Sequence, residues 1–471
     1  MNPPKTIRAT LTALLGVILS LAAYAVQESP KGARPITPLP TLEVSANKRF
    51  LQTSDRKPFF WTGDTAWIAI ERLTREEMIH YFQDRSGKGF NVLQVMVIRN
   101  LPTKNVYGAQ PFVDDDPTQP LLRPADNNYW THVDYFVDEA ANHGLYVALV
   151  PIWGNAAKKL PTDGKWATAY GAFLANRYGK RTNVIWLNGG DILGSLLTPV
   201  WENLGSTLDA MTTHQLITYH PFARVSSSQW FHDRKWLDFN MFQSGHRTYD
   251  QRRETDPVEK WKGEDNWRYV AEDLARNPPK PTIDGEPSYE DIPHGLHNPD
   301  DGYWTTPNVR RYQYWSVFAG SFGLTFGNNS VFQFHAPEHG KGFYSPRRYW
   351  KQALNIPGAG QMRHLKELML SRSYFDRVPD QSLVAGKNGG RYDYVVATRG
   401  DNYAFLYTYT GRAFDVAGGK IAGARVKATW MNPRNGEMTV MGDFDNTGVL
   451  HFQPPGKPEP GNDWVLILDS K

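Results

Sequence analysis

The feature that most constrains the fold of this chain is a repeated alternation of short apolar runs with longer helical segments. The most regular run, residues 183–191, reads Asn-Val-Ile-Trp-Leu-Asn-Gly-Gly-Asp. It is apolar without strict alternation, which is typical of a parallel strand covered on both faces. A second run, residues 281–286, also stops at a carboxylate, Glu286. Alternating strands and helices predict a parallel sheet, and about eight such units favour closure into a (β/α)8 TIM barrel.

Local signals place the other elements of the alternation. The first strands are expected within residues 50–63, and the capping box Thr74-Arg-Glu-Glu predicts a helix to about residue 87. An open doubly wound sheet would be expected to carry a glycine-rich phosphate-binding turn after its first strand, and the sequence has none. A polar loop to about residue 128 is long enough to be a lid or wall. Further strands are expected at 91–99, 145–153, 216–221, 238–245 and 323–329, and helices at 130–143, 166–178, 200–213, 257–276, 308–319 and 360–371.

Both ends of the chain differ from this alternation. Lys5 and Arg8, an apolar run over residues 11–23 and the small-x-small site Ala23-Tyr-Ala25 predict a signal peptide at 1–25, and so a secreted or periplasmic protein. A proline-rich linker is expected at 26–41, and the barrel at 42–377. Residues 378–471 are predicted to form a small antiparallel β-sandwich with an Asn-Gly hairpin at 433–436. Its strands are expected at 392–399, 403–409, 426–430, 438–442, 449–452 and 465–468.

Charge and cysteine content exclude several functional classes. The formal net charge of +4 becomes +2 without residues 1–25, which favours neither a nucleic-acid partner nor a membrane surface. The chain has no cysteine, so thiol nucleophiles and cysteine-based zinc sites are excluded. His335 and His339 have helical spacing, but the intervening Pro337 favours a loop over a metal site. No metal or other cofactor is therefore expected.

The candidate chemistry lies at the carboxyl ends of the strands, where barrels carry their active sites. Asp191 is expected to end strand four and Glu286 strand seven, so the two carboxylates would face each other across the mouth. Two opposed carboxylates are what glycoside hydrolysis requires. The structural alternative is that each is a rim acid in an ion pair. Asp284 points to the same face as Glu286 and is interpreted as a buried supporting acid, with a role as nucleophile left open.

Eight other residues at strand ends are predicted to contact substrate. Aromatic rings can stack on sugars, and polar side chains can bond sugar hydroxyls. Each also has a structural alternative, such as a helix cap, wall packing or a satisfied core histidine. The predicted set is Asp64, Trp67, Arg99, Trp153, His220, Gln243, His246 and Asn328.

Several of these strand ends together resemble one known family. The segments are 60–67 (Phe-Trp-Thr-Gly-Asp-Thr-Ala-Trp), 188–191 (Asn-Gly-Gly-Asp), 219–221 (Tyr-His-Pro), 242–246 (Phe-Gln-Ser-Gly-His) and 284–287 (Asp-Gly-Glu-Pro). In this order they are similar to the apiosidase-like glycoside hydrolases, glycoside hydrolase family 140. The tail, with Ala-Thr-Trp-Met-Asn-Pro-Arg-Asn-Gly-Glu at 428–437, resembles the collagen-binding-type β-domain that often accompanies that family.

The resemblance implies a barrel in which Asp191 is the acid/base and Glu286 the nucleophile. It also implies exo-acting removal of a sugar such as apiose from the glycan side chains of plant cell walls, with retention of the anomeric configuration as the expected course. The alternatives are an arabinofuranosidase, an endo-β-glycanase or a glycan-binding protein without catalysis. An oligo- or polysaccharide is the expected partner in every case.

Overall fold

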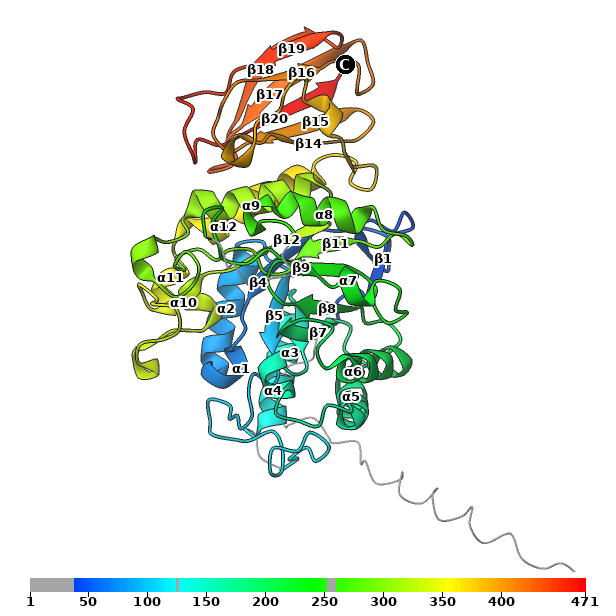
Figure 1. The fold of residues 1–471 in the computed structure, drawn as a ribbon, viewed down its shortest axis with the longest axis vertical. Helices are drawn as coiled ribbons and strands as arrows, with labels where there is room; N and C mark the ends of the chain where they lie inside the picture. Colours follow the sequence, from blue (N-terminus) through cyan, green and yellow to red (C-terminus); the bar gives the residue numbers. More distant parts are fainter. Residues whose placement is uncertain (1–37, 124–126, 252–259) are drawn as a thin grey trace, which may run out of the picture. The chain divides into compact units, whose positions relative to one another are not determined.

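The computed structural model describes residues 38–123, 127–251 and 260–471, and its centre is a barrel of parallel strands surrounded by helices (Figure 1). Six strands form one parallel sheet in the order β12-β4-β5-β6-β7-β8, and β10 and β11 pair in parallel beside them. The predicted signal peptide lies outside the described residues. The strands are β4 (Trp61–Thr65), β5 (Val92–Met96), β6 (Tyr146–Val150), β7 (Val184–Ile192), β8 (Ile217–Pro221), β10 (Asn240–Gln243), β11 (Thr282–Asp284) and β12 (Gly323–Phe326).

Hydrogen bonds close the two gaps between these sheets. The amide of Asp238, just before β10, donates to the carbonyl of Ile217 on β8 at 2.9 Å. The amide of Phe322, just before β12, donates to the carbonyl of Thr282 on β11 at 3.2 Å. The predicted (β/α)8 barrel is therefore confirmed, with β7 as its fourth strand and β11 as its seventh.

The helices follow their sequence signals closely. Thr74 and Glu77 form the predicted capping box at the start of α2 (Arg75–Gly87). One prediction was too long, because the helix expected at 257–276 is a 3-10 turn followed by α8 (Asn266–Leu274), with 252–259 outside the described residues. The other helices are α1 (Ala69–Arg72), α3 (Tyr129–Asn142), α4 (Gly154–Ala157), α5 (Lys165–Tyr178), α6 (Thr198–Met211), α7 (Ser228–Phe231), α9 (Thr306–Phe318), α10 (Asn329–Phe332), α11 (Trp350–Ala353) and α12 (Pro357–Leu370).

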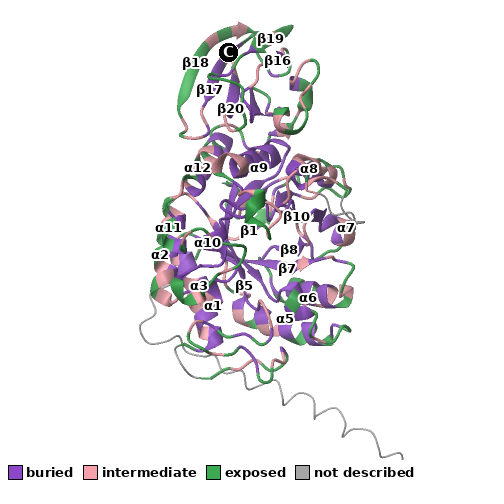
Figure 2. Ribbon diagram, turned by 60° about the vertical axis from the view of Figure 1, so that its left-hand side comes forward, coloured by how far each residue is buried: buried purple, intermediate pink, exposed green. Residues whose placement is uncertain are grey.

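The barrel strands are buried on both faces, as their uninterrupted apolar runs predict (Figure 2). Large aromatic side chains fill much of this core, and Trp61, Trp186 and Trp201 have no exposed surface. Many of the chain's tryptophans are therefore packing residues. Among the described residues, no helix combines the length and apolar character needed to cross a membrane.

The C-terminal part is a β-sandwich, as predicted. One sheet has the order β13-β14-β15-β20-β17-β18, and a second pairs β16 with β19. The turn at 433–436 joins β17 to β18, with Gly436 at a φ of 77°. Residues 391–393 form a 3-10 turn and not the start of a strand, and β13 and β16 were not predicted. The strands are β13 (Val378–Pro379), β14 (Val396–Arg399), β15 (Tyr403–Thr408), β16 (Phe414–Ala417), β17 (Arg425–Met431), β18 (Met438–Asp445), β19 (Val449–Phe452) and β20 (Trp464–Ser470).

Two further features complete the fold. The short strands β1 (Leu42–Val44), β2 (Leu51–Thr53) and β3 (Pro58–Phe59) form an antiparallel sheet before the barrel, and β9 (Val225–Ser226) pairs antiparallel with β10. A buried ion pair joins α9 to the sandwich, because Arg310 Nη2 lies 2.6 Å from Asp463 Oδ1. The sandwich thus packs on the barrel through a specific, desolvated contact.

Candidate active site

Asp191 leaves the barrel at the end of β7 through an unusual backbone turn. Gly189, Gly190 and Asp191 have φ values of 86°, 115° and 46°, all in the left-handed region that favours glycine. Space also requires the glycines, because a Cβ on Gly190 would lie 2.4 Å from a ring carbon of Trp153. A Cβ on Gly189 would meet the ring of Tyr219 at 2.5 Å. The Gly-Gly pair therefore lets the strand turn sharply and present the Asp191 carboxylate at the mouth.

Glu286 follows β11 and is held from several sides. Gln94 on β5 donates its Nε2 to the carbonyl of Gly285 at 2.8 Å, which fixes the backbone beside the glutamate. The carboxylate itself meets two imidazoles. His220 Nε2 lies 3.3 Å from Oε2, and His246 Nε2 lies 3.1 Å from Oε1. The carboxylate therefore has an imidazole nitrogen beside each of its oxygens.

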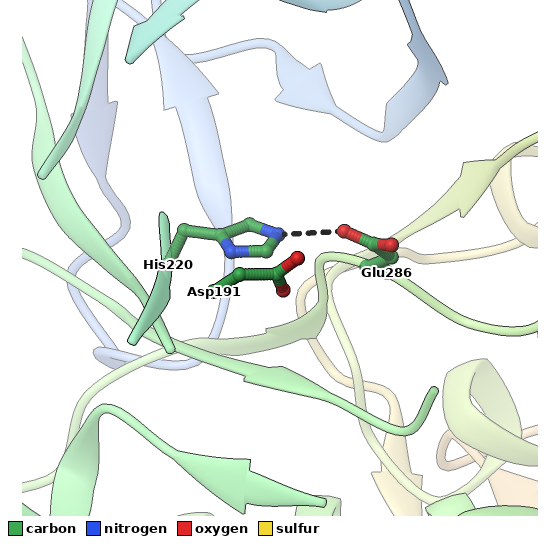
Figure 3. A group of neighbouring side chains, drawn as sticks. All are labelled: Asp191, His220 and Glu286. Carbon is green, nitrogen blue, oxygen red and sulfur yellow. Dashed lines mark ion pairs between the residues drawn. The ribbon is translucent and has the colours of Figure 1, made fainter. Parts of the chain in front are cut away.

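Asp191, His220 and Glu286 come together in one cluster, with one oxygen or nitrogen from each within 4.8 Å of the others. Figure 3 shows the three side chains pointing toward one another, with the His220 ring beside the Asp191 carboxylate and facing Glu286. Aromatic rings pack against the cluster. The rings of Trp67 and Trp153 have centroids 5.2 Å and 5.4 Å from that of His220. The cluster is thus largely buried, with aromatic rings beside the titratable groups.

The two carboxylates have opposite pKa shifts. Burial, together with the negative charge of Glu286, raises the pKa of Asp191 to about 7. Burial alone would raise the pKa of Glu286, but hydrogen bonds and charge from His220 and His246 outweigh it and lower the pKa to about 2. Between these values Asp191 carries a proton and Glu286 is ionised. Such a pair can donate a proton and attack a carbon at the same time.

A known protein family matches most of the barrel. The family model described as "Apiosidase-like, catalytic domain" matches residues 45–376.

The chain belongs to the apiosidase-like family.

Two solved structures support the assignment of this apiosidase-like chain. One, described as "Glycoside hydrolase", has 45% identity and a TM-score of 0.89, and the match covers 92% of this chain and 97% of that one. The other, a glycoside hydrolase family 5 structure from Bacteroides vulgatus ATCC 8482, has 43% identity and a TM-score of 0.89, with 91% and 94% covered. No match is found among curated proteins. The protein is therefore a glycosidase, and a carbohydrate is its substrate.

The sandwich also matches a family model. The model, described as "Putative collagen-binding domain of a collagenase", covers residues 378–469. This agrees with the resemblance seen in the tail of the sequence. The label describes the family and is not evidence that this sandwich binds collagen.

The predicted substrate-contacting residues divide into two groups. Trp67, Trp153, His220 and His246 surround the two carboxylates, and Gln243 shares a hydrogen bond with Asp191 that lowers the pKa of the acid. Three others are engaged elsewhere. Asp64 pairs with Arg85, Arg99 pairs with Glu71 at 2.8 Å, and the Asn328 side chain caps the start of α10. The structure does not bring these three side chains to the cluster.

Asp284 is a buried acid beside the site that holds neighbouring residues through hydrogen bonds. It is 1% exposed, and its carboxylate accepts hydrogen bonds from the amide and hydroxyl of Ser244 and from Asn266 Nδ2. Burial raises the pKa of Asp284 to about 6. These bonds anchor Ser244, which lies two residues before His246. Asp284 therefore helps to fix the loop that carries His246, one of the two histidines that contact Glu286.

Tyr289 is a site residue that the sequence reasoning did not single out. Its hydroxyl accepts a hydrogen bond from Trp67 Nε1 at 2.6 Å, and its ring lies 4.7 Å from that of His246. It thus connects Trp67 with His246 beside the carboxylates. Its position three residues after Glu286 is the only sequence signal that could have indicated it.

The cluster also has the composition of a cation site. Asp191, His220 and Glu286 each offer one donor atom, and carboxylate and imidazole donors can ligate transition metals. His220 Nε2 lies 3.3 Å from Glu286 Oε2, so these two side chains also contact each other directly. Glycoside hydrolysis needs only the two carboxylates, so family membership favours the acid–base interpretation.

Asp64 stabilises the barrel through a fully buried ion pair, and this makes a testable prediction. Its Oδ2 accepts from Arg85 Nε and from the Tyr81 hydroxyl, each at 2.5 Å, and neither Asp64 nor Arg85 is exposed. Arg85→Ala should lower the free energy of unfolding by about 3–5 kcal/mol, because it leaves a buried carboxylate without its partner. Urea denaturation followed by tryptophan fluorescence measures this loss.

A matched control uses an exposed arginine. Arg234 pairs with Glu202 at 2.5 Å, but their side chains are 47% and 27% exposed. Arg234→Ala should cost no more than about 1 kcal/mol. Equal losses in the two variants would contradict a special role for the buried pair.

Proposed function

We propose that this glycosidase removes a terminal apiose-type sugar from glycan side chains of the plant cell wall, by a double displacement that retains anomeric configuration. Asp191 is the acid/base and Glu286 the nucleophile. The observation that carries the mechanism is that two carboxylates lie together in one cluster with His220, and their opposite pKa shifts agree with the two roles. The proposed sugar follows the description of the family.

The spacing of the carboxylates supports retention. Their nearest donor atoms lie within 4.8 Å of each other. Retaining enzymes hold the two carboxyl groups about 5–5.5 Å apart, whereas inverting enzymes leave about 6.5–9.5 Å for a water molecule. Glu286 can then attack the anomeric carbon while Asp191 protonates the leaving oxygen. Asp191 subsequently takes a proton from the water that releases the sugar.

Export is part of the proposal. The signal-like segment at residues 1–25 would be removed after Ala25, and the mature chain would begin at Val26. An enzyme that acts on cell-wall glycans must meet them outside the cytoplasm, so the two parts of the proposal agree.

The test is incubation with pectic oligosaccharides, followed by chromatography of the released sugars. We expect one monosaccharide, apiose, and proton NMR of the first-formed product should show the anomeric configuration of the substrate. Release of arabinose would refute apiose as the sugar that is removed and would identify an arabinofuranosidase. Oligomeric products would indicate endo action, and saturable binding without any product would refute catalysis. A first-formed product of opposite configuration would refute retention.

A further inference from the structure

Two neighbouring aromatic side chains, Phe343 and Tyr344, stand exposed on the loop at residues 340–349, here called the aromatic loop. It connects the end of the α10 region with α11. Phe343 is 39% exposed and Tyr344 is 37% exposed, although each is a large apolar ring. Isolated exposed rings are common on protein surfaces. The case for a function therefore depends on how the loop is held and what it faces.

Buried polar side chains hold the aromatic loop in a conformation that its own residues disfavour. Tyr344 and Ser345 have φ values of 56° and 48°, in the left-handed region. Asn329 Nδ2 donates to the carbonyl of Tyr344 at 2.8 Å. Gln333 donates to the carbonyl of Phe343 at 2.8 Å and accepts from its amide at 2.6 Å. Backbone of this kind persists only where surrounding structure fixes it, and it is concentrated at functional sites.

Two arginines contact the ring of Phe343. The guanidinium groups of Arg72 and Arg99 lie 5.5 Å and 5.8 Å from the centre of its ring. Arg99, which was predicted to bind substrate, thus contacts this loop while pairing with Glu71. The arginines thus contact the ring, which remains 39% exposed.

A continuous row of rings connects Tyr344 to the nucleophile. Its ring centroid lies 6.3 Å from that of Phe332, which lies 5.6 Å from that of Tyr289. Tyr289 in turn contacts His246, the neighbour of Glu286. The charges of the two carboxylates also affect the pKa of the Tyr344 hydroxyl. Its pKa is raised by burial, then by the charge of Asp191 and then by that of Glu286. The row of ring contacts therefore places Tyr344 beside the active site, on its exposed side.

We propose that Tyr344 is the platform on which the sugar ring on the leaving-group side of the cleaved bond stacks, with Phe343 and His297 beside it. An exo-acting enzyme encloses the sugar that it removes, and Glu286 and His220 are buried whereas Tyr344 is exposed, so the platform meets the part of the glycan that departs. Sugars present apolar C–H faces that pack on aromatic rings. The His297 ring lies 5.8 Å from that of Tyr344 and extends the surface. The inference rests on the proposed function. It adds that Tyr344 determines which glycans bind on the leaving-group side of the cleaved bond.

The test compares two substrates that carry the same cleaved sugar, an oligosaccharide and the methyl glycoside. The methyl group is too small to cover the platform. Tyr344→Ala should raise KM for the oligosaccharide about tenfold while changing kcat by less than about twofold, since stacking contributes equally to bound substrate and transition state. KM for the methyl glycoside should not change. Tyr344→Trp should retain the wild-type KM for the oligosaccharide.

Tyr107 supplies the matched control, because it is a tyrosine with a similar exposure of 39% on a different loop. Tyr107→Ala should leave both substrates unaffected. An equal loss on both substrates in Tyr344→Ala would overturn the inference, and so would an unchanged KM for the oligosaccharide. The comparison uses whichever sugar the enzyme releases. A sugar other than apiose would therefore refute the proposed substrate without deciding the role of Tyr344.

Discussion

Glu286→Ala is expected to lower kcat by at least about 10⁴-fold, because Glu286 forms the covalent intermediate in the proposed double displacement. His220 and His246 keep the Glu286 carboxylate ionised and oriented. Replacing Glu286 by alanine removes the attacking oxygen and leaves the two histidines without the carboxylate that they contact. Initial rates of sugar release from the competent oligosaccharide, compared with the wild-type protein, measure the effect.

Azide should distinguish a lost nucleophile from a damaged fold. The space left by the Glu286 side chain can admit this small anion, which attacks the anomeric carbon while Asp191 protonates the leaving group. The product would be a glycosyl azide of inverted configuration, and turnover would partly recover. A variant that stays folded but releases sugar at the wild-type rate would refute the assignment of Glu286.

Asp284→Asn is the matched control for this experiment, because Asp284 is a buried carboxylate at the end of β11, two residues before Glu286. Its oxygens are occupied by Ser244 and Asn266, so it should not act as the nucleophile. The amide can keep at least one of these bonds, and azide should not alter its rate. Complete inactivity of Asp284→Asn that azide restores would transfer the nucleophile role to Asp284.

The sequence predicted the positions of the two acids because barrel closure imposes them. Parallel strands that follow one another around a barrel all end at the same rim, so residues 191 and 286 must meet there even though they are far apart in the chain. The apolar run at 183–191 and its Gly-Gly end made strand four recognisable. Local capping signals likewise predicted α2 almost to the residue.

Side-chain direction limited the rest of the site prediction. Asp64 lies on β4 near the rim, but its side chain meets Tyr81 and Arg85 of the covering helix α2, not the pocket. Successive residues of a strand point to opposite sides, and without a known register the sequence does not fix which side is inside. Tyr289 and the aromatic loop depend on contacts between distant segments, for which the sequence carries no local signal.

Asp191→Ala is expected to reduce activity in a way that depends on the leaving group. For an oligosaccharide, whose departing oxygen needs a proton, kcat/KM should fall about 10³-fold, within the usual contribution of general acid catalysis. A 2,4-dinitrophenyl glycoside of the same sugar departs without a proton, so cleavage of its bond should be much less affected. Parallel kcat/KM measurements on the two substrates test this. Equal losses on both would contradict the role of Asp191 as the acid.

The pH profile gives a second, independent expectation for Asp191. Because the pKa of Asp191 is about 7, wild-type kcat/KM should fall as the pH rises through about 7 and the acid loses its proton. Glu286, with a pKa of about 2, stays ionised through the mildly acidic range, so it causes no loss there. In Asp191→Ala the fall near pH 7 should disappear.

Asp238→Asn is the control for the pH profile, because burial also raises the pKa of Asp238, to about 6. Its carboxylate accepts a hydrogen bond from the Ile217 amide at the start of β8, the end of the strand opposite to His220. This variant should keep the fall near pH 7. If the fall is lost in Asp238→Asn and persists in Asp191→Ala, the titrating acid is not the one at the end of β7, and the assignment of the proton donor is wrong.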